Sequence, residues 1–139
     1  MSMELNFKIS EFNITGKPIP EDIADAILKH HILPMQPIRS AIGIPINVSL
    51  NSGYRPLWHE IKMGRSGKSQ HVFANGKGAT DWTCDNLDLL EELMVKQSPY
   101  TRICRYTTFI HADYKDTNGE RQHFKNGKDG WEFQGFIGL

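Results

Sequence analysis

The stretch Ile46-Asn47-Val48-Ser49-Leu50-Asn51-Ser52-Gly53-Tyr54-Arg55-Pro56 is the part of the chain that most constrains its fold. Apolar and polar side chains alternate from Ile46 to Leu50, which predicts a strand with one buried face. The residues that follow include asparagine, serine, glycine and proline, which together favour a turn. The chain is therefore expected to pass directly from a half-buried strand into a turn.

Three scaffold helices are predicted around this strand. The first begins at Pro20, where proline and acidic residues form a helix-start signal, and Pro34 is expected to interrupt it. The second covers Gln36–Ile42 and stops at Gly43, because glycine is common just past the end of a helix. The third covers residues 56–63.

The second half of the chain changes its pattern twice. A helix is predicted from Asp85 onward, because acidic residues in its first turns complement the helix dipole. Two strands, Thr101–Tyr106 and Thr108–Tyr114, are predicted next from their alternating side chains. Asn118-Gly119 is a turn signal, and it predicts a hairpin that leads into a strand around residues 121–124.

These elements predict an α+β fold in which N-terminal helices pack on a mainly antiparallel sheet. The 139 residues suit a single domain covering 1–139, and such a chain buries roughly two-thirds of its unfolded surface. Lys and Arg number 16, as do Asp and Glu, so the overall charge gives no reason to expect nucleic acid as a partner. Three aromatic residues near the end are expected to close the core or to line a cleft: Trp131, Phe133 and Phe136.

Two histidines and one aspartate are candidates for a zinc site. Two imidazoles and a carboxylate form a common ligand set for catalytic zinc, and they leave the fourth coordination position open. His71, Asp81 and His111 are therefore the predicted ligands of Zn²⁺, and a metallohydrolase is the predicted class of protein. The segments that carry them are Ser69-Gln70-His71, Gly78-Ala79-Thr80-Asp81 and Phe109-Ile110-His111-Ala112-Asp113.

The order of these segments resembles the zinc D-Ala-D-Ala carboxypeptidase and endopeptidase family, whose members cleave bacterial peptidoglycan and share a fold with the hedgehog signalling domain. The likeness spans roughly residues 5 to 115, and its start looks like that of small, often phage-encoded, members. The matching motifs are Phe7-Lys8-Ile9-Ser10-Glu11-Phe12, Pro37-Ile38-Arg39, Gly43-Ile44-Pro45-Ile46, Ser52-Gly53-Tyr54-Arg55, Ser69-Gln70-His71, Ala79-Thr80-Asp81 and Phe109-Ile110-His111-Ala112-Asp113.

The resemblance implies a small phage-type hedgehog/D-Ala-D-Ala peptidase-like domain that hydrolyses peptide bonds in peptidoglycan stem peptides or cross-links. D-Ala-D-Ala carboxypeptidase, L-Ala-D-Glu endopeptidase and cross-bridge cleavage all remain open. It also implies that Arg55 grips substrate carboxylate or carbonyl groups with its fork of donors, the alternative being an Arg that ties down its own loop. Ser69 is a second candidate for substrate binding, or for capping a turn.

Two features depart from the family pattern. His71 and Asp81 are ten residues apart, which is a longer interval than the family uses, although a loop absorbs extra residues at small entropic cost. Asp85 therefore stays open as an alternative ligand. Many relatives carry an acidic residue three positions before the distal histidine, where this chain has Thr108.

Asp113 is the candidate that replaces the missing carboxylate. Residues two apart on a strand point to the same face, so Asp113 is expected beside His111. It would either accept a proton from the attacking water as general base or orient His111. The departure at Thr108 also keeps a different class of function open, a catalytically inactive wall-binding or virion module that retains the fold.

The remaining histidines and the two cysteines are expected to be structural. His30 and His31 follow the first helix as surface or boundary residues. His123 could act in catalysis only if the predicted hairpin returned it to the site, and strand register is not determined by sequence. Cys84 and Cys104 are expected to be reduced, with a thiolate ligand at Cys84 as a less favoured alternative.

The first residues, Met1 to Asn6, lack the cationic start and apolar run of a signal peptide. The sequence also lacks the roughly twenty consecutive apolar residues of a membrane span. We therefore expect synthesis in the cytoplasm and, as for a phage lysin, action at the bacterial cell wall after release or delivery. The expected partner is a peptidoglycan peptide.

Overall fold

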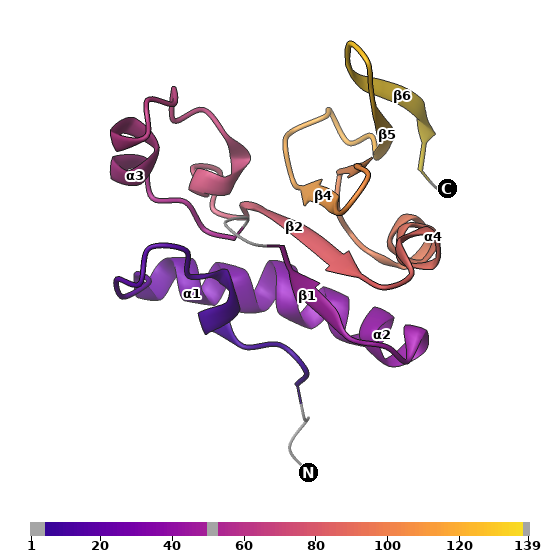
Figure 1. Cartoon of the computed structure of the whole chain (residues 1–139), viewed down its shortest axis with the longest axis horizontal. Helices are drawn as coiled ribbons and strands as arrows, with labels where there is room; N and C mark the ends of the chain where they lie inside the picture. The colour runs from indigo at the N-terminus through magenta and orange to yellow at the C-terminus, as the bar shows by residue number, and fades with distance from the viewer. Residues whose placement is uncertain (1–4, 50–52, 138–139) are drawn as a thin grey trace.

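The computed structural model of the chain describes residues 5–49 and 53–137, and its α+β fold confirms the predicted class. A six-stranded, mostly antiparallel sheet forms one layer, and a long helix runs beside β1 and β2 (Figure 1). Leu50, Asn51 and Ser52, at the end of the predicted strand and the start of its turn, lie outside the described residues.

The N-terminal helix continues past Pro34, so the predicted interruption is wrong. Its three parts are α1 (Glu21–Ile27), a π-helical turn (Leu28–Ile32) and α2 (Leu33–Ile42). Pro34 lies in the first turn of α2 and leaves the carbonyl of His30 without its usual N–H partner. The Tyr114 hydroxyl donates to that carbonyl at 2.5 Å and replaces the lost bond. The helix ends at Gly43, as predicted, with a positive φ of 72°.

Two further helices confirm the sequence prediction. Helix α3 (Leu57–Lys62) follows Pro56, and α4 (Leu87–Gln97) begins after Asn86. The Asn86 side chain accepts a hydrogen bond from the backbone N–H of Leu89 at 3.2 Å, which caps the start of α4. On its inner face α4 places two fully buried side chains in the core, Leu90 and Met94.

The sheet contains six strands in the order β1-β2-β4-β3-β5-β6. Neighbouring strands are antiparallel except for β3 and β5, which are parallel. The strands are β1 (Ile46–Val48), β2 (Ala79–Cys84), β3 (Arg102–Arg105), β4 (Ile110–Asp113), β5 (Gln122–Gly127) and β6 (Gly130–Phe136).

The predicted hairpin at Asn118-Gly119 is wrong, although the turn itself forms. Both residues have positive φ, 57° and 82°, as a tight turn requires. The strand that follows does not pair with β4, because β4 already has β2 on one side and β3 on the other. The chain instead crosses over β3, and β5 pairs with the free edge of β3 in parallel.

Side chains alternate between the two faces of the central strands. On one face, Trp82, Ile103 and Ile110 are fully buried and form a core with apolar side chains of the long helix and α4. The opposite face of the same strands carries polar residues, among them Asp81 and His111, which lie directly opposite each other in the β2–β4 register. The sheet therefore separates the apolar core from a polar site.

Two expectations about individual side chains are corrected. His31 is fully buried, because it lies on the inner side of the π-helical turn and contacts the core. Phe133 and Phe136 do not close the core, since they are 50% and 65% exposed on β6, the last strand at the sheet edge. Trp131 is half-buried, and its ring lies 5.3 Å from the His111 ring.

Candidate metal centre

His71, Asp81 and His111 come together on the polar face of the sheet. One ligand atom from each residue lies within 4.8 Å of the other two, so the group could hold a metal ion. His71 comes from a short 3-10 turn, Asp81 from the middle of β2, and His111 from β4. The carboxylate oxygen Oδ1 of Asp81 is 2.8 Å from Nδ1 of His111 and 3.3 Å from Nε2 of His71.

Two sequence motifs hold His71 in place. Its Nδ1 lies 3.0 Å from the backbone carbonyl of Gly53, so Nδ1 carries the proton and Nε2 is left facing Asp81. Its backbone N–H donates to the Ser69 hydroxyl at 3.2 Å, and its carbonyl accepts from the backbone N–H of Arg55 at 2.9 Å. The Gly53-Tyr54-Arg55 segment and the Ser69-Gln70-His71 turn therefore fix each other.

Gly53 also lies against the backbone of Phe12, at the end of the N-terminal Phe7–Phe12 segment. A Cβ atom at Gly53 would lie 2.5 Å from the backbone oxygen of Phe12, so only glycine allows this approach. The next residue, Tyr54, donates its backbone N–H to the same oxygen at 2.9 Å. The N-terminal segment thus supports the backbone that positions His71.

The ten-residue interval between His71 and Asp81 is an ordered loop. The Asn75 carboxamide oxygen accepts from the backbone N–H groups of Lys77 and Gly78 at 3.0 and 2.9 Å. The Lys77 carbonyl is in turn bound by Nε2 of the buried His31 at 2.7 Å. The chain therefore reaches β2 with Asp81 in the cluster. Asp85, the alternative ligand, is exposed beyond the end of β2.

Asp113 lies on the other side of the His111 ring from Asp81. Its Oδ2 is 2.8 Å from Nε2 of His111, which leaves Nδ1 as the nitrogen that faces the centre. Asp113 is fully buried and also accepts hydrogen bonds from Nε and Nη2 of Arg102 and from the backbone N–H of Lys115. As predicted, it lies beside His111, with its carboxylate held from three sides.

The electrostatics of the cluster suit a cation. Burial opposes ionisation of Asp81, but hydrogen bonds from His111 and His71 outweigh it and hold the pKa of Asp81 below its ordinary value. Burial likewise opposes ionisation of Asp113, and hydrogen bonds from His111 and Arg102 lower its pKa. Burial lowers the pKa of His111, but the two carboxylates raise it above its ordinary value overall. Both carboxylates are therefore ionised at neutral pH.

Arg55 and Ser69, the predicted substrate-binding residues, contact each other. Nη2 of Arg55 donates to the Ser69 hydroxyl at 2.8 Å, and Nε of Arg55 lies 3.1 Å from the carboxylate of Glu60. Glu60 is fully buried and is paired with Arg65 as well. These contacts agree with the alternative in which Arg55 ties down its own loop. Substrate binding by Arg55 and Ser69 stays a prediction.

The residue that sequence analysis missed is Arg102. Its guanidinium pairs with Asp113 and lies over the Trp131 ring, with 4.6 Å from Cζ to the ring centroid. Trp131 donates its indole N–H to the Tyr106 hydroxyl at 2.6 Å. The alternation of Arg102 and Cys104 with apolar Ile103 was the only available signal, since the partner of Arg102 depends on strand register.

His123 and the cysteines lie outside the cluster. His123 pairs with Ile103 in register and so points to the helix-covered face, where its Nε2 is 2.7 Å from the Glu91 carboxylate. It therefore does not approach Asp113. Both cysteines are unpaired, as expected, and Cys84 lies half-buried near the end of β2. Burial raises the pKa of the Cys104 thiol to about 12, which keeps it protonated.

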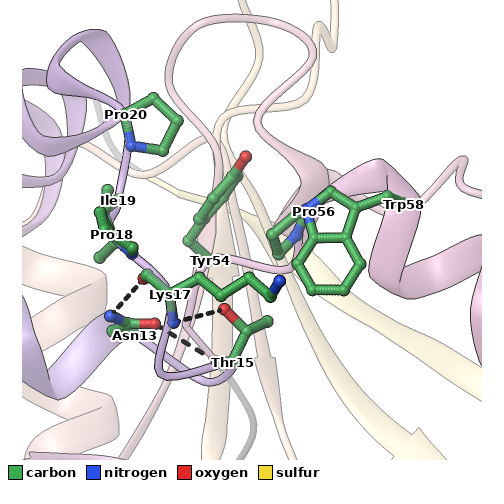
Figure 2. A pocket seen from close by; sticks show the side chains of 9 residues that line it. All are labelled: Asn13, Thr15, Lys17, Pro18, Ile19, Pro20, Tyr54, Pro56 and Trp58. Atoms are coloured by element: carbon green, nitrogen blue, oxygen red, sulfur yellow. Dashed lines mark hydrogen bonds between the residues drawn. The ribbon is translucent and has the colours of Figure 1, made fainter.

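A small pocket lies beside Tyr54 and Pro56, apart from the cluster. It has a volume of about 80 Å³ and contains none of the candidate ligands. Figure 2 shows the Lys17 side chain reaching past Tyr54 toward Trp58, and the Lys17 ammonium is 5.4 Å from the centroid of that ring. Asn13 closes the loop beneath it by donating to the Lys17 carbonyl at 2.8 Å. The lining residues are Asn13, Thr15, Lys17, Pro18, Ile19, Pro20, Tyr54, Pro56 and Trp58.

Comparison of the chain with protein-family models, curated proteins and solved structures found no match. Across residues 5–49 and 53–137, none of the helices combines the length and the apolar character needed to cross a membrane.

Proposed function

We propose that the chain is a zinc metallopeptidase that hydrolyses peptide bonds in bacterial peptidoglycan, as a D-Ala-D-Ala carboxypeptidase or an endopeptidase of the endolysin type. The observation that carries the proposal is the convergence of His71, Asp81 and His111, with ligand atoms within 4.8 Å of one another. The resemblance of the motifs to peptidoglycan peptidases supplies the substrate class.

The donor set fits zinc. Two imidazole nitrogens and a carboxylate oxygen are the donors of many three-residue catalytic zinc sites. Asp113 stands behind His111, at the nitrogen that faces away from the cluster, as carboxylates commonly stand behind ligand histidines. When bound by these residues, zinc would activate water and polarise a substrate carbonyl.

The loop that holds His71 is the proposed substrate-binding element. Arg55 keeps 21% of its side chain exposed while Ser69 and Glu60 hold it, so it can meet a substrate carboxylate from a fixed position. The Ser69 hydroxyl accepts hydrogen bonds from Arg55 and His71, which leaves its own proton free to be donated to a substrate oxygen.

The contacts of Asp113 favour a role in orienting His111. A general base needs a carboxylate oxygen within reach of the water it deprotonates. Asp113 is fully buried, and both of its oxygens accept hydrogen bonds from Arg102, while Oδ2 also meets His111. The assignment of Asp113 as general base stays a prediction, which a conservative substitution separates from the orienting role.

Digestion of purified peptidoglycan tests the proposed function. The zinc-loaded protein should release new amine ends, and removal of zinc with a chelator should stop the release until zinc is restored. His111→Ala should be inactive under the same conditions, and Asp85→Ala should match the unaltered protein because Asp85 lies outside the cluster. Equal release by the unaltered protein and His111→Ala would rule out the metal-dependent reaction.

A catalytically inactive wall-binding or virion module is the second candidate. It is favoured by Thr108, which stands where many relatives carry an acidic residue. It is also favoured by the ion pairs of Arg102 and His111 with Asp113, which engage the carboxylate that would otherwise accept a proton from water. The same digestion separates the two functions. Binding of the zinc-loaded protein to sedimented peptidoglycan without any new amine ends would support the module over the peptidase.

A further inference from the structure

Arg102 is the one charged group on the polar face of the central strands that the proposed function does not use. It lies opposite Asp113 in the β3–β4 register, so the two side chains leave the sheet side by side. Its Nε is 2.9 Å from Oδ1 and 3.1 Å from Oδ2 of Asp113, and its Nη2 also donates to Oδ2. This is a bidentate ion pair, which fixes the plane of a carboxylate as well as its position.

The carboxylate held in this way is the one that meets His111. Oδ2 of Asp113 accepts from Arg102 and lies 2.8 Å from Nε2 of His111. The opposite nitrogen, Nδ1, lies 2.8 Å from Asp81 and is the ligand atom that faces His71 and the centre. The contacts thus form a line from Arg102 through Asp113 and His111 to the cluster.

The Arg102 side chain is itself fixed. Its guanidinium carbon lies 4.6 Å from the centroid of the Trp131 ring, an arrangement in which a cation is attracted to the ring face. Trp131 is anchored by its hydrogen bond to the Tyr106 hydroxyl. The Trp131 side chain, which comes from β6, therefore lies over the Arg102 guanidinium, and the Arg102 side chain is only 18% exposed.

We infer that Arg102 is a positioning residue of the metal centre: by clamping Asp113 it keeps Nε2 of His111 engaged and presents Nδ1 to the metal ion. This inference rests on the proposed metal centre and adds a residue to it. Arg102 does not touch the ligand cluster itself, so its effect passes through Asp113. Loss of a carboxylate partner behind a ligand histidine usually weakens metal binding by about 10–100-fold, and loss of Arg102 should approach the lower end of that range.

Arg105 provides a matched control on the same strand. It also pairs with two carboxylates, Asp88 and Glu91, at 2.8 and 3.0 Å, but it points to the helix-covered face. Its substitution removes a comparable set of ion pairs without touching Asp113. Comparison of Arg102→Met with Arg105→Met therefore separates an effect on the centre from a general loss of stability.

The test is a double-mutant cycle on zinc affinity, measured with a competing chelator. Arg102→Met should bind zinc about tenfold more weakly, Arg102→Lys should lie between it and the unaltered protein, and Arg105→Met should remain within about twofold. Adding Arg102→Met to Asp113→Asn should change affinity by less than about twofold, because Arg102 acts through Asp113. Additive losses in the double variant, or equal losses in Arg102→Met and Arg105→Met, would overturn the inference.

A second measurement covers the outcome in which Arg102→Met does not fold. Nitrogen-15 NMR of the zinc-loaded protein reports which ring nitrogen of His111 binds zinc. Nδ1 alone is expected in the unaltered protein, and a mixture of Nδ1 and Nε2 is expected in Arg102→Lys. Nδ1 alone in both would contradict the positioning role. Zinc binding without peptidoglycan cleavage would remove the proposed peptidase while leaving this inference in place.

Discussion

Two histidine sites flank strand β2, one on each face, and they differ in what surrounds the imidazole. On the helix-covered face, the ring nitrogens of His31 meet the Tyr100 hydroxyl and the Lys77 carbonyl, each at 2.7 Å. On the polar face, the ring nitrogens of His111 meet the carboxylates of Asp81 and Asp113, each at 2.8 Å. Both histidines have both nitrogens engaged, but only His111 is placed between negative charges.

The groups hydrogen-bonded to each imidazole decide which histidine is suited to bind a metal cation. Burial lowers the pKa of His31 to about 3, so this ring is neutral and joins the π-helical turn to the loop before β2. Burial acts in the same direction on His111, yet hydrogen bonds to Asp113 and Asp81 raise its pKa overall. A buried histidine among hydroxyl and carbonyl groups is a structural link, whereas one between carboxylates suits a metal centre.

The largest expected effect separates the two sites by zinc affinity. His71→Ala and His111→Ala should each weaken zinc binding by more than about 100-fold, because each removes one of three ligands outright. His31→Phe should leave zinc affinity unchanged within about twofold. Zinc stoichiometry by mass spectrometry and circular dichroism would be measured on each folded variant. Near-stoichiometric zinc in both ligand variants would sink the assignment.

The converse effect is on stability. His31→Phe should lower the free energy of unfolding by about 2–3 kcal/mol, because it leaves the buried Lys77 carbonyl without its donor and the Tyr100 hydroxyl with the Trp82 indole N–H as its remaining partner. In metal-free protein His111→Ala should lower it by less, since Asp113 keeps Arg102 as a partner and Asp81 keeps His71. Urea denaturation of the chelator-treated variants would measure both values. Equal losses of unfolding free energy in the two variants would contradict the claim that His31 is the structural histidine and His111 is not.

A smaller effect sharpens the description of the polar face. Asp113→Asn should weaken zinc binding by about 10–100-fold if Asp113 orients His111, because the amide cannot replace the ionised partner of the ring. If Asp113 is instead the general base, the same variant should keep its zinc and cleave peptidoglycan about 100-fold more slowly. Measurement of affinity and cleavage rate on one preparation decides between the two roles.

The smallest effect is a pH dependence that belongs to His31. Its pKa in the folded protein is about 3, below the 6.5 of an unperturbed histidine, so between these values the unfolded chain binds one more proton. Stability due to this residue is therefore complete above about pH 6.5 and falls by up to about 1.4 kcal/mol per pH unit below it. The stability difference between the unaltered protein and His31→Phe should narrow from pH 7 to pH 5. A constant difference would show that His31 is not held neutral.

The three residues that converge in the cluster could be singled out from sequence because their residue types and the short motifs around them are visible in the chain itself. His71 follows a short turn motif, and Asp81 and His111 stand within patterns typical of strands. The helix end at Gly43 and the start of α4 were equally accessible, since each depends on neighbouring residues alone. Local signals therefore covered the fold class and most of the cluster.

The errors all involve partners that are distant in sequence. The hairpin prediction at Asn118-Gly119 is wrong because β4 pairs with β3 and has no edge left for β5. That pairing is a property of the assembled sheet. Pro34 does not interrupt the helix, because the Tyr114 hydroxyl donates to the His30 carbonyl in place of the missing N–H. Tyr114 lies 84 residues after His30 in the sequence. Arg102 was missed for the same reason, since its pairing with Asp113 depends on the β3–β4 register.

Anomalous diffraction at the zinc edge, from crystals of the zinc-loaded protein, tests the central claim most directly. The account predicts one strong peak on the polar face of β2, within bonding distance of Nε2 of His71, the Asp81 carboxylate and Nδ1 of His111. Nε2 of His111 should remain on Asp113. A crystal with no peak between these three side chains, or with its zinc bound only at other residues, would contradict the claim that this face of the sheet is a zinc centre.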